Sequence, residues 1–267
     1  MLGHWHPPPA ILASMLLHGA AITSLAVAPQ HWSWLLQGLV ANHAALGLLG
    51  MHPRSRMLGR NLWRLPPASR IRGEVALTFD DGPDPEVTPR VLDLLDEAGA
   101  HASFFVIGRE ARRCPALIRE IRLRGHSVEN HTFSHPLFLA ARGPMAHRRE
   151  ILMAQEAIRE AGGDPRYFRA PLGLRSPLLY PALDTTGLLH VSWTHRGADG
   201  LVRSADRVLK RFADTRAGDI LLLHDGRQRH GQTAVLEMLG PLLRQLTAKG
   251  LRSVSLPEVL SAAQDGT

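Results

Sequence analysis

The chain has 267 residues, 45 % of them hydrophobic, which is enough to bury a core and excludes a disordered protein. Its single cysteine, Cys114, excludes an intrachain disulfide and a cysteine-based metal site. The formal net charge of +7 is unevenly placed, because residues 1–73 contain six arginines and no acidic residue. We interpret this as a local basic cluster beside a membrane and expect no nucleic-acid partner.

Two uncharged, mainly apolar runs come first, at residues 10–28 and 32–51. Each has about the length that a helix needs to cross ~30 Å of hydrocarbon. We predict two transmembrane helices that form a hydrophobic hairpin; a single or re-entrant span and a cleaved signal peptide are the alternatives. Ala26-Val27-Ala28 resembles a cleavage site, but Pro29 follows it and no basic residue precedes the first run.

The basic cluster follows the second run directly and predicts the orientation. Positive residues near a span stay on the cytoplasmic side, so we expect the rest of the chain at the cytoplasmic face of a bacterial-type cell membrane. An extracytoplasmic location is the alternative. We divide the chain into a membrane-anchoring segment, residues 1–64, and a folded domain, residues 65–267, joined at a stiff Pro66-Pro67 linker. The six arginines are Arg54, Arg56, Arg60, Arg64, Arg70 and Arg72.

From residue 74 onward, short apolar runs alternate with amphipathic ones. We expect strands at residues 75–79, 103–107, 127–129, 167–170, 188–193, 220–223 and 253–256. We expect helices at residues 88–99, 115–125, 144–161 and 233–248, and one more that begins at Ser204. Such alternation predicts a parallel sheet, open or closed into a barrel, with functional residues at the carboxyl ends of the strands.

The first predicted strand ends in the motif T-F-D-D-G-P, with Asp80 and Asp81 side by side. Two adjacent carboxylates are costly unless a cation or a proton separates their charges, although a polar turn explains the same residues. The motif H-T-F-S-H follows the third predicted strand and places His131 and His135 four residues apart. With Asp81 they supply two nitrogens and one oxygen, the ligand set of a hydrolytic zinc site; a pair of surface or core histidines is the alternative.

Two further motifs end predicted strands. R-A-P-L-G contains Arg169, and an arginine at a strand end can pair with a carboxylate and hold it ionised. L-L-L-H-D contains His224, which by itself is more often a structural histidine.

These four motifs, in this order within residues 70–260, resemble the signature motifs of the polysaccharide deacetylase family (NodB homology, carbohydrate esterase family 4). The resemblance implies an α/β fold, a distorted (β/α) barrel of NodB-homology type, here preceded by the hydrophobic helical hairpin. It implies one divalent metal ion, usually zinc. It also implies a hydrolase for amide bonds other than peptide bonds, which removes N-acetyl groups from an amino sugar in a polysaccharide, oligosaccharide or lipid-linked glycan.

The resemblance also implies roles for single residues. Asp81, His131 and His135 become the metal ligands, Asp80 the general base and His224 the general acid.

Three other residues receive supporting roles from the same resemblance. Arg169 would orient and ionise the base, and Leu172 falls where the family uses a backbone N–H as an oxyanion donor. The family usually has an Asp-Trp pair before the last strand, whose aspartate tunes the acid histidine. Asp199 is the best match here, with Gly200 in place of the tryptophan, which suggests a different acetyl or sugar pocket.

The main alternative is a catalytically inactive, membrane-anchored carbohydrate-binding module. It predicts a lost ligand or base, yet the residues expected as ligands, base and acid are all present, together with the arginine: Asp80, Asp81, His131, His135, Arg169 and His224. A phosphoryl-transfer protein that used the Asp pair would need a lysine, serine or threonine near the phosphate, and the two lysines of the domain, Lys210 and Lys249, lie outside the motifs. We expect a carbohydrate substrate and the membrane as partners and no obligate protein partner. A cytoplasmic site favours a lipid-linked or other precursor over mature cell-wall polymer.

Overall fold

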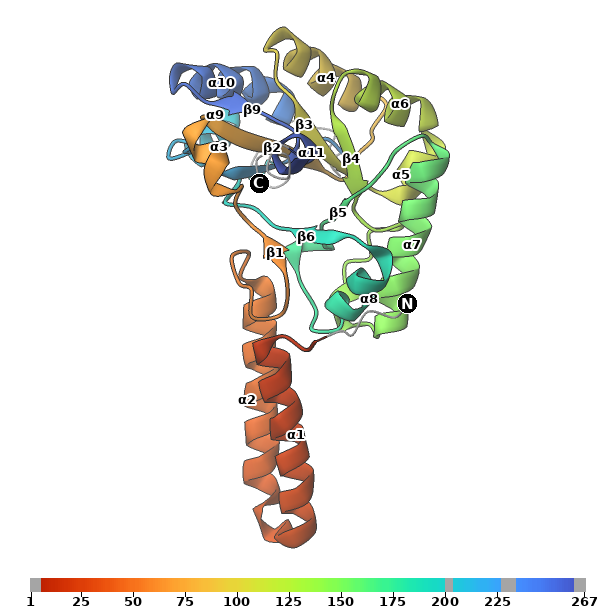
Figure 1. Cartoon of the computed structure of the whole chain (residues 1–267), viewed down its shortest axis with the longest axis vertical. Helices are drawn as coiled ribbons and strands as arrows, with labels where there is room; N and C mark the ends of the chain where they lie inside the picture. The colour runs from red at the N-terminus through yellow and green to blue at the C-terminus, as the bar shows by residue number, and fades with distance from the viewer. Residues whose placement is uncertain (1–5, 200–203, 227–233, 262–267) are drawn as a thin grey trace.

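Two long helices project as a stalk from a body of strands and helices (Figure 1). The computed structural model describes residues 6–199, 204–226 and 234–261. Helix α1 (Pro9–Val27) and helix α2 (Trp32–Met51) are joined by the 3-10 turn η1 (Pro29–His31), so the predicted apolar hairpin is present. Their mean hydropathies of 1.9 and 1.2, and their largely exposed side chains, make both long and apolar enough to cross a membrane.

The body is one sheet of nine parallel strands, in the order β1-β6-β5-β4-β3-β2-β8-β7, with β9 beside β2. The predicted α/β fold with a parallel sheet is therefore confirmed. The strands are β1 (Asn61–Leu62), β2 (Glu74–Asp80), β3 (Ala102–Val106), β4 (Ser127–Asn130), β5 (Tyr167–Phe168), β6 (Leu189–Val191), β7 (His195–Arg196), β8 (Ile220–His224) and β9 (Arg252–Ser253).

Helices follow most strands and cover the outside of the sheet (Figure 1). They are α3 (Pro67–Ile71), α4 (Thr88–Glu97), α5 (Gly108–Arg113), α6 (Pro115–Leu123), α7 (Pro144–Glu160), α8 (Leu179–Thr186), α9 (Ala205–Lys210), α10 (Ala234–Ala248) and α11 (Leu256–Ser261), with 3-10 turns η2 (Leu139–Ala141) and η3 (Pro171–Gly173). All seven residues of β2 are buried, because apolar clusters pack against both of its faces. Phe79 belongs to one cluster and Ala76 to the other.

Every predicted strand has an observed counterpart, and the differences are confined to short elements. Strands β1 and β7 have two residues each, too few to produce a hydrophobic period. The last predicted strand ends at Ser253 instead of residue 256, because Leu256 begins α11. The prediction of a linker at Pro66-Pro67 was wrong: Pro67 is the first residue of α3, a position that suits proline because its missing N–H is not needed there.

The structure leaves two predicted boundaries as predictions. Thr233, the predicted start of the last long helix, lies outside the described residues, and α10 is described from Ala234. Strand β1 pairs with β6, so the predicted membrane-anchoring segment, residues 1–64, contributes the edge strand of the sheet. The division at residue 64 stays a prediction.

Candidate active site

The strand register brings the motif residues to one edge of the sheet. Asp80, the last residue of β2, pairs directly with His224, the last residue of β8. On the other side of β2, β4 ends at Asn130, and its register partner on β5 is Phe168. His131 and Arg169 follow these two positions, so they leave the same edge. The parallel strands thus place all four motifs at their carboxyl ends.

Asp81, His131 and His135 converge on one point. Oδ1 of Asp81 lies 3.4 Å from Nε2 of His131 and 3.3 Å from Nε2 of His135, and one ligand atom from each residue fits within 4.8 Å. Oδ1 of Asp81 has no hydrogen-bond partner among the described residues. Nδ1 of His131 donates to the carbonyl oxygen of Arg169 over 2.9 Å, which directs Nε2 toward the aspartate. Two nitrogens and one oxygen, each free to bind, fit a divalent metal such as zinc.

The electrostatics of this cluster favour a positive charge. Burial lowers the pKa of His131, but the charges of Asp80 and Asp81 raise it by more, and the net shift is upward. Burial raises the pKa of Asp81, but His131, His224 and His135 lower it by more. Burial, and then the charge of His131, lower the pKa of His135. The three side chains are thus coupled to one another, with Asp81 held ionised between the two histidines.

Asp80 is held by a fully buried arginine. Nη1 of Arg169 donates to Oδ1 of Asp80 over 2.7 Å and to the hydroxyl of Thr78 over 2.8 Å. The other guanidinium donors bind the carbonyl oxygens of Val191 and Ser192. Oδ2 of Asp80 faces the three candidate metal ligands and lies 3.8 Å from Nε2 of His131. The arginine therefore occupies one carboxylate oxygen and leaves the other facing the site.

His224 is bound twice by Asp199. Nδ1 of His224 lies 2.9 Å from Oδ1 of Asp199, and the backbone N–H of His224 donates to Oδ2 over 2.8 Å. Burial lowers the pKa of His224, but Asp199, with smaller effects from Asp80 and Asp81, raises it to about 9. The imidazole is thus protonated at neutral pH. Gly200, which replaces the tryptophan of the family motif, lies outside the described residues.

Backbone strain is concentrated at the same edge. In the described part of the chain, five non-glycine residues have a positive φ: Asp81, Thr132, His135, Leu172 and Ala198. Each is a predicted site residue or lies next to one. Leu172, in η3, has φ 58°, and its side chain is 53 % exposed. Such conformations cost about 1–3 kcal/mol each and persist where the surrounding structure enforces them, as at functional sites.

Sequence reasoning missed Glu150, on α7. Its Oε2 accepts hydrogen bonds from the backbone N–H groups of Phe133 and Ser134, over 3.1 and 2.8 Å, and its Oε1 accepts from the Ser134 hydroxyl over 2.8 Å. It therefore holds the loop between the two histidines. Nothing in the sequence marks this glutamate among the polar residues of its helix.

Asp225 was quoted in the fourth motif without a role. It is fully buried, and Oδ2 accepts from the Thr88 hydroxyl over 2.6 Å. Burial raises its pKa to about 7. Its carboxyl packs against Gly82, where any side chain would overlap it, so it supports the turn that follows the Asp pair.

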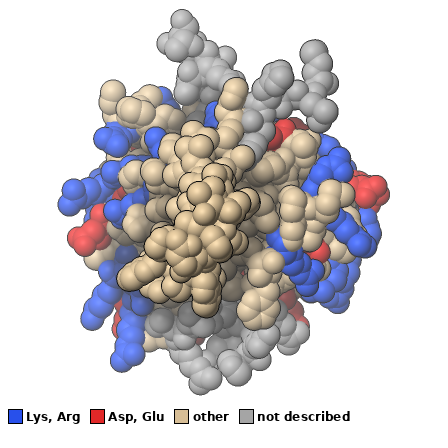
Figure 2. Space-filling view, turned by 90° about the horizontal axis from the view of Figure 1, so that it is seen from below, with Lys and Arg blue, Asp and Glu red and all other residues tan. Residues whose placement is uncertain are grey.

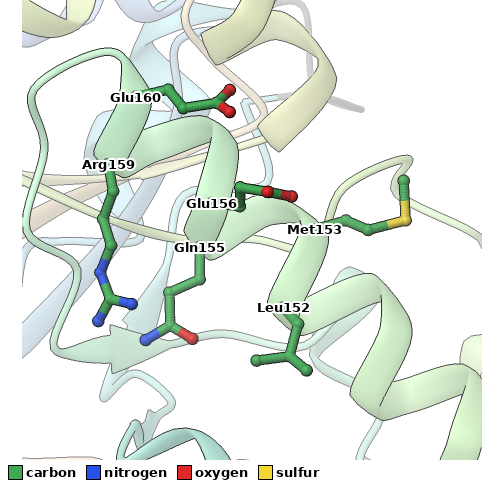
Figure 3. A pocket seen from close by; sticks show the side chains of 6 residues that line it. All are labelled: Leu152, Met153, Gln155, Glu156, Arg159 and Glu160. Carbon is green, nitrogen blue, oxygen red and sulfur yellow. The ribbon is translucent and has the colours of Figure 1, made fainter.

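The outer face of α7 carries an open depression that is separate from this site (Figure 3). It is lined by one helix alone, by Leu152, Met153, Gln155, Glu156, Arg159 and Glu160. It contains none of the predicted site residues.

Comparison with known proteins decides the family. The family model described as polysaccharide deacetylase matches residues 69–190. A peptidoglycan-N-acetylglucosamine deacetylase of Bacillus cereus is 32 % identical over 207 residues, which cover 74 % of this chain and 92 % of that protein. The chain belongs to the polysaccharide deacetylase family.

Other relatives of this polysaccharide deacetylase agree. A chitooligosaccharide deacetylase of Azorhizobium caulinodans is 35 % identical over 208 residues, covering 72 % of this chain and 99 % of the relative. The solved structure of a family 4 carbohydrate esterase from Streptomyces lividans superposes with a TM-score of 0.63 at 32 % identity, over 68 % of this chain and 91 % of that one. The predicted family, its barrel-type fold and its class of amide-bond hydrolase are confirmed.

Proposed function

We propose that the chain is a membrane-anchored, zinc-dependent deacetylase that removes N-acetyl groups from an amino sugar in a polysaccharide, oligosaccharide or lipid-linked glycan. One observation carries this proposal. The unpaired Oδ1 of Asp81 faces two histidine nitrogens at 3.3–3.4 Å, while Asp80 and His224 flank it from paired positions on β2 and β8. A metal site between a carboxylate and a protonated imidazole suits amide hydrolysis.

In this proposal Asp81, His131 and His135 hold the metal. A bound divalent zinc ion supplies a Lewis acid, which polarises a carbonyl oxygen and lowers the pKa of water. Among the described residues, these three side chains form the group that could hold the ion, so a four-coordinate zinc would keep one position for water or substrate.

The proton transfers belong to Asp80 and His224. Oδ2 of Asp80, the oxygen that Arg169 leaves free, takes a proton from the attacking water. His224, protonated through its pairing with Asp199, gives a proton to the nitrogen of the departing amine. The backbone N–H of Leu172 donates to the oxyanion that forms on the acyl carbon. The amine therefore leaves as a neutral group.

The substrate class follows from the relatives. One is named for N-acetylglucosamine in peptidoglycan and another for chitooligosaccharides, so both act on N-acetylated amino sugars. The chain matches 92 % and 99 % of their lengths, which supports the same chemistry here.

The hairpin supplies the proposed anchor. Viewed along the stalk, its surface carries no charged side chain, and lysine and arginine side chains, with acidic ones among them, lie to its left and right on the face of the body beyond (Figure 2). Six arginines and no acidic residue accompany the hairpin in residues 1–73, which favours the cytoplasmic face for the catalytic domain. A reporter fused to the C-terminus that is active only in the cytoplasm tests this side, and a silent reporter contradicts it.

The activity is tested with the full chain in detergent. We expect amine release from N-acetylglucosamine oligomers that a chelator abolishes and added zinc restores. The variant Asp80→Asn should lose about 10²–10⁴-fold in kcat, because it lacks the base, and should keep one zinc per chain. Loss of zinc in that variant contradicts the role of Asp80, and a wild-type chain that binds zinc but releases no amine from any N-acetylated sugar contradicts the function.

A further inference from the structure

A second buried arginine lies where the hairpin meets the body. Arg175 is only 1 % exposed. Its Nη2 donates to the carbonyl oxygens of Leu49 and His52 over 3.1 and 2.6 Å. Its Nη1 donates to the carbonyl oxygen of Ser55 over 2.8 Å and to the Tyr180 hydroxyl over 3.2 Å. No acidic side chain in the described part of the chain forms an ion pair with this guanidinium.

The carbonyl groups explain how this charge is tolerated. Helix α2 ends at Met51, and the carbonyl oxygens of its last turn have no partner within the helix. They carry the negative end of the helix dipole, which stabilises a cation. Arg175 thus caps the carboxyl end of the second apolar helix, although it is placed on the loop that follows η3.

The backbone of Arg175 also contacts the end of α2. The N–H of Arg175 donates to the carbonyl oxygen of Gly50 over 3.2 Å. A side chain on Gly50 would overlap the carbonyl oxygen of Arg175. Only glycine therefore permits the loop to lie directly on the end of α2.

The two parts also share one apolar core. Ile11 and Leu46 of the hairpin helices belong to the same buried cluster as Phe168 of β5 and Tyr180 of α8. Leu58, fully buried between hairpin and sheet, completes it. The base of the hairpin is therefore packed into the core of the body and is not joined to it by a linker alone.

The loop between these contacts carries the proposed oxyanion donor. Arg169 binds Asp80 at one end of the loop, and Arg175 binds the end of α2 at the other, three residues after Leu172. We propose that Arg175 is a positioning residue: it fastens the Leu172 loop to the end of α2, so that the membrane hairpin is part of the catalytic framework. This rests on the proposed function, because it assigns the hairpin a task in the same reaction.

The test compares full-length variants in detergent. Arg175→Met removes the cap, and Gly50→Ala separates the loop from the helix while keeping the guanidinium. We expect each to lower kcat for N-acetylglucosamine oligomers by at least about tenfold, with KM and zinc content unchanged, because small displacements of a catalytic group are costly. The double variant should lose little more than either single one, since both break one connection. Arg56→Met, an exposed arginine of the same hairpin-side segment, is the control and should keep wild-type kcat.

Hydrogen–deuterium exchange gives a readout that does not depend on turnover. In both variants the amides of residues 171–176 should exchange faster, while those of residues 127–135, which lead into the metal cluster, keep wild-type rates. Unchanged exchange in residues 171–176, or a loss of kcat that only follows a loss of zinc, overturns the proposal. A wild-type chain that deacetylates no sugar refutes the proposed function, whereas faster exchange confined to residues 171–176 still upholds the coupling of loop and hairpin.

Discussion

The amino-terminal and carboxyl-terminal edges of the parallel sheet differ in how completely their buried carboxylates are paired with basic side chains. At the amino edge, the buried Glu74 receives two hydrogen bonds of 2.8 Å from Arg72 and a further ion pair from Arg252. Asp219, just before β8, pairs with Arg64 over 2.9 Å and with His195 over 3.1 Å.

At the carboxyl edge, one oxygen of Asp81 has no hydrogen bond, and Asp81 is one of five described non-glycine residues with a strained positive φ that lie at or next to predicted site residues. Opposite charges neutralise the acids at the edge that only holds the fold. At the edge proposed to catalyse, Arg169 pairs with one oxygen of Asp80, but Asp80 and Asp81 each keep one oxygen open to a ligand, and strain is tolerated. The following three predictions test whether this division between the edges is real.

The largest effect is expected from substituting Glu150, which holds the loop of the candidate metal ligands at the carboxyl edge. Glu150→Ala removes three hydrogen bonds from the loop between His131 and His135. Zinc affinity, measured by competition with a chelator, should fall about 10–100-fold, the usual result of removing a support of metal ligands. Glu150→Gln keeps an oxygen for the two backbone donors and should stay near the wild type. An unaltered affinity in the alanine variant would show that the ligands hold their own geometry.

A smaller effect is expected from Asp199→Asn. His224 acts in its protonated form, so kcat/KM should fall as the pH rises through its pKa of about 9. Asparagine keeps the shape but removes the negative charge, and the alkaline limb should move about one to three units toward lower pH. The same pairing stabilises the fold fully below pH 6.5, and this contribution is lost as the pH rises through about 9. An alkaline limb that stays in place would exclude His224 as its origin.

The smallest effect on activity is expected at the amino edge. Glu74→Gln breaks its ion pairs and should lower the free energy of unfolding by about 2 kcal/mol, while kcat stays within twofold. The pKa of Glu74 lies below its usual range; burial raises it, but Arg72, Ser69 and Arg252 lower it by more. Its stabilisation is therefore present above that range and is lost on acidification, so the melting temperatures of variant and wild type should converge at low pH.

Glu160→Gln is the matched control for this comparison. It alters an exposed ion pair with Arg112 and should leave the melting temperature unchanged. A large loss of kcat in Glu74→Gln would mean that the two edges do not differ as described.

The sequence alone predicted seven of the nine described strands and the motifs that end four of them, but not the two-residue strands β1 and β7. Short apolar runs between amphipathic stretches predicted the strands, and in a parallel sheet their ends meet, so Asp80, His131, Arg169 and His224 were expected at one edge. Contacts between distant segments were not predictable in this way. Glu150 supports a loop 16 and 17 residues away, and no local pattern in the sequence encodes that contact.

Arg175 shows the same limit more strongly, because the carbonyl partners of its guanidinium lie 120 to 126 residues earlier in the chain. The sequence analysis joined the membrane-anchoring segment to the folded domain only through a stiff linker at Pro66-Pro67. The packing of Ile11 and Leu46 against Phe168 depends on tertiary structure, and a sequence period reports only which face of a helix is apolar.

The position of β2 has a consequence for the biosynthesis of the protein. This strand carries both aspartates and lies between β3, which follows soon in the chain, and β8, whose Ile220 pairs with Ala76. As the polypeptide emerges from the ribosome, one side of β2 stays unpaired until nearly the whole domain has been made. Strand β1 likewise has no pairing partner until β6 has been synthesised. The hairpin is made before the sheet, so in the proposed membrane-anchored protein the nascent chain would complete its sheet after the hairpin has entered the lipid bilayer.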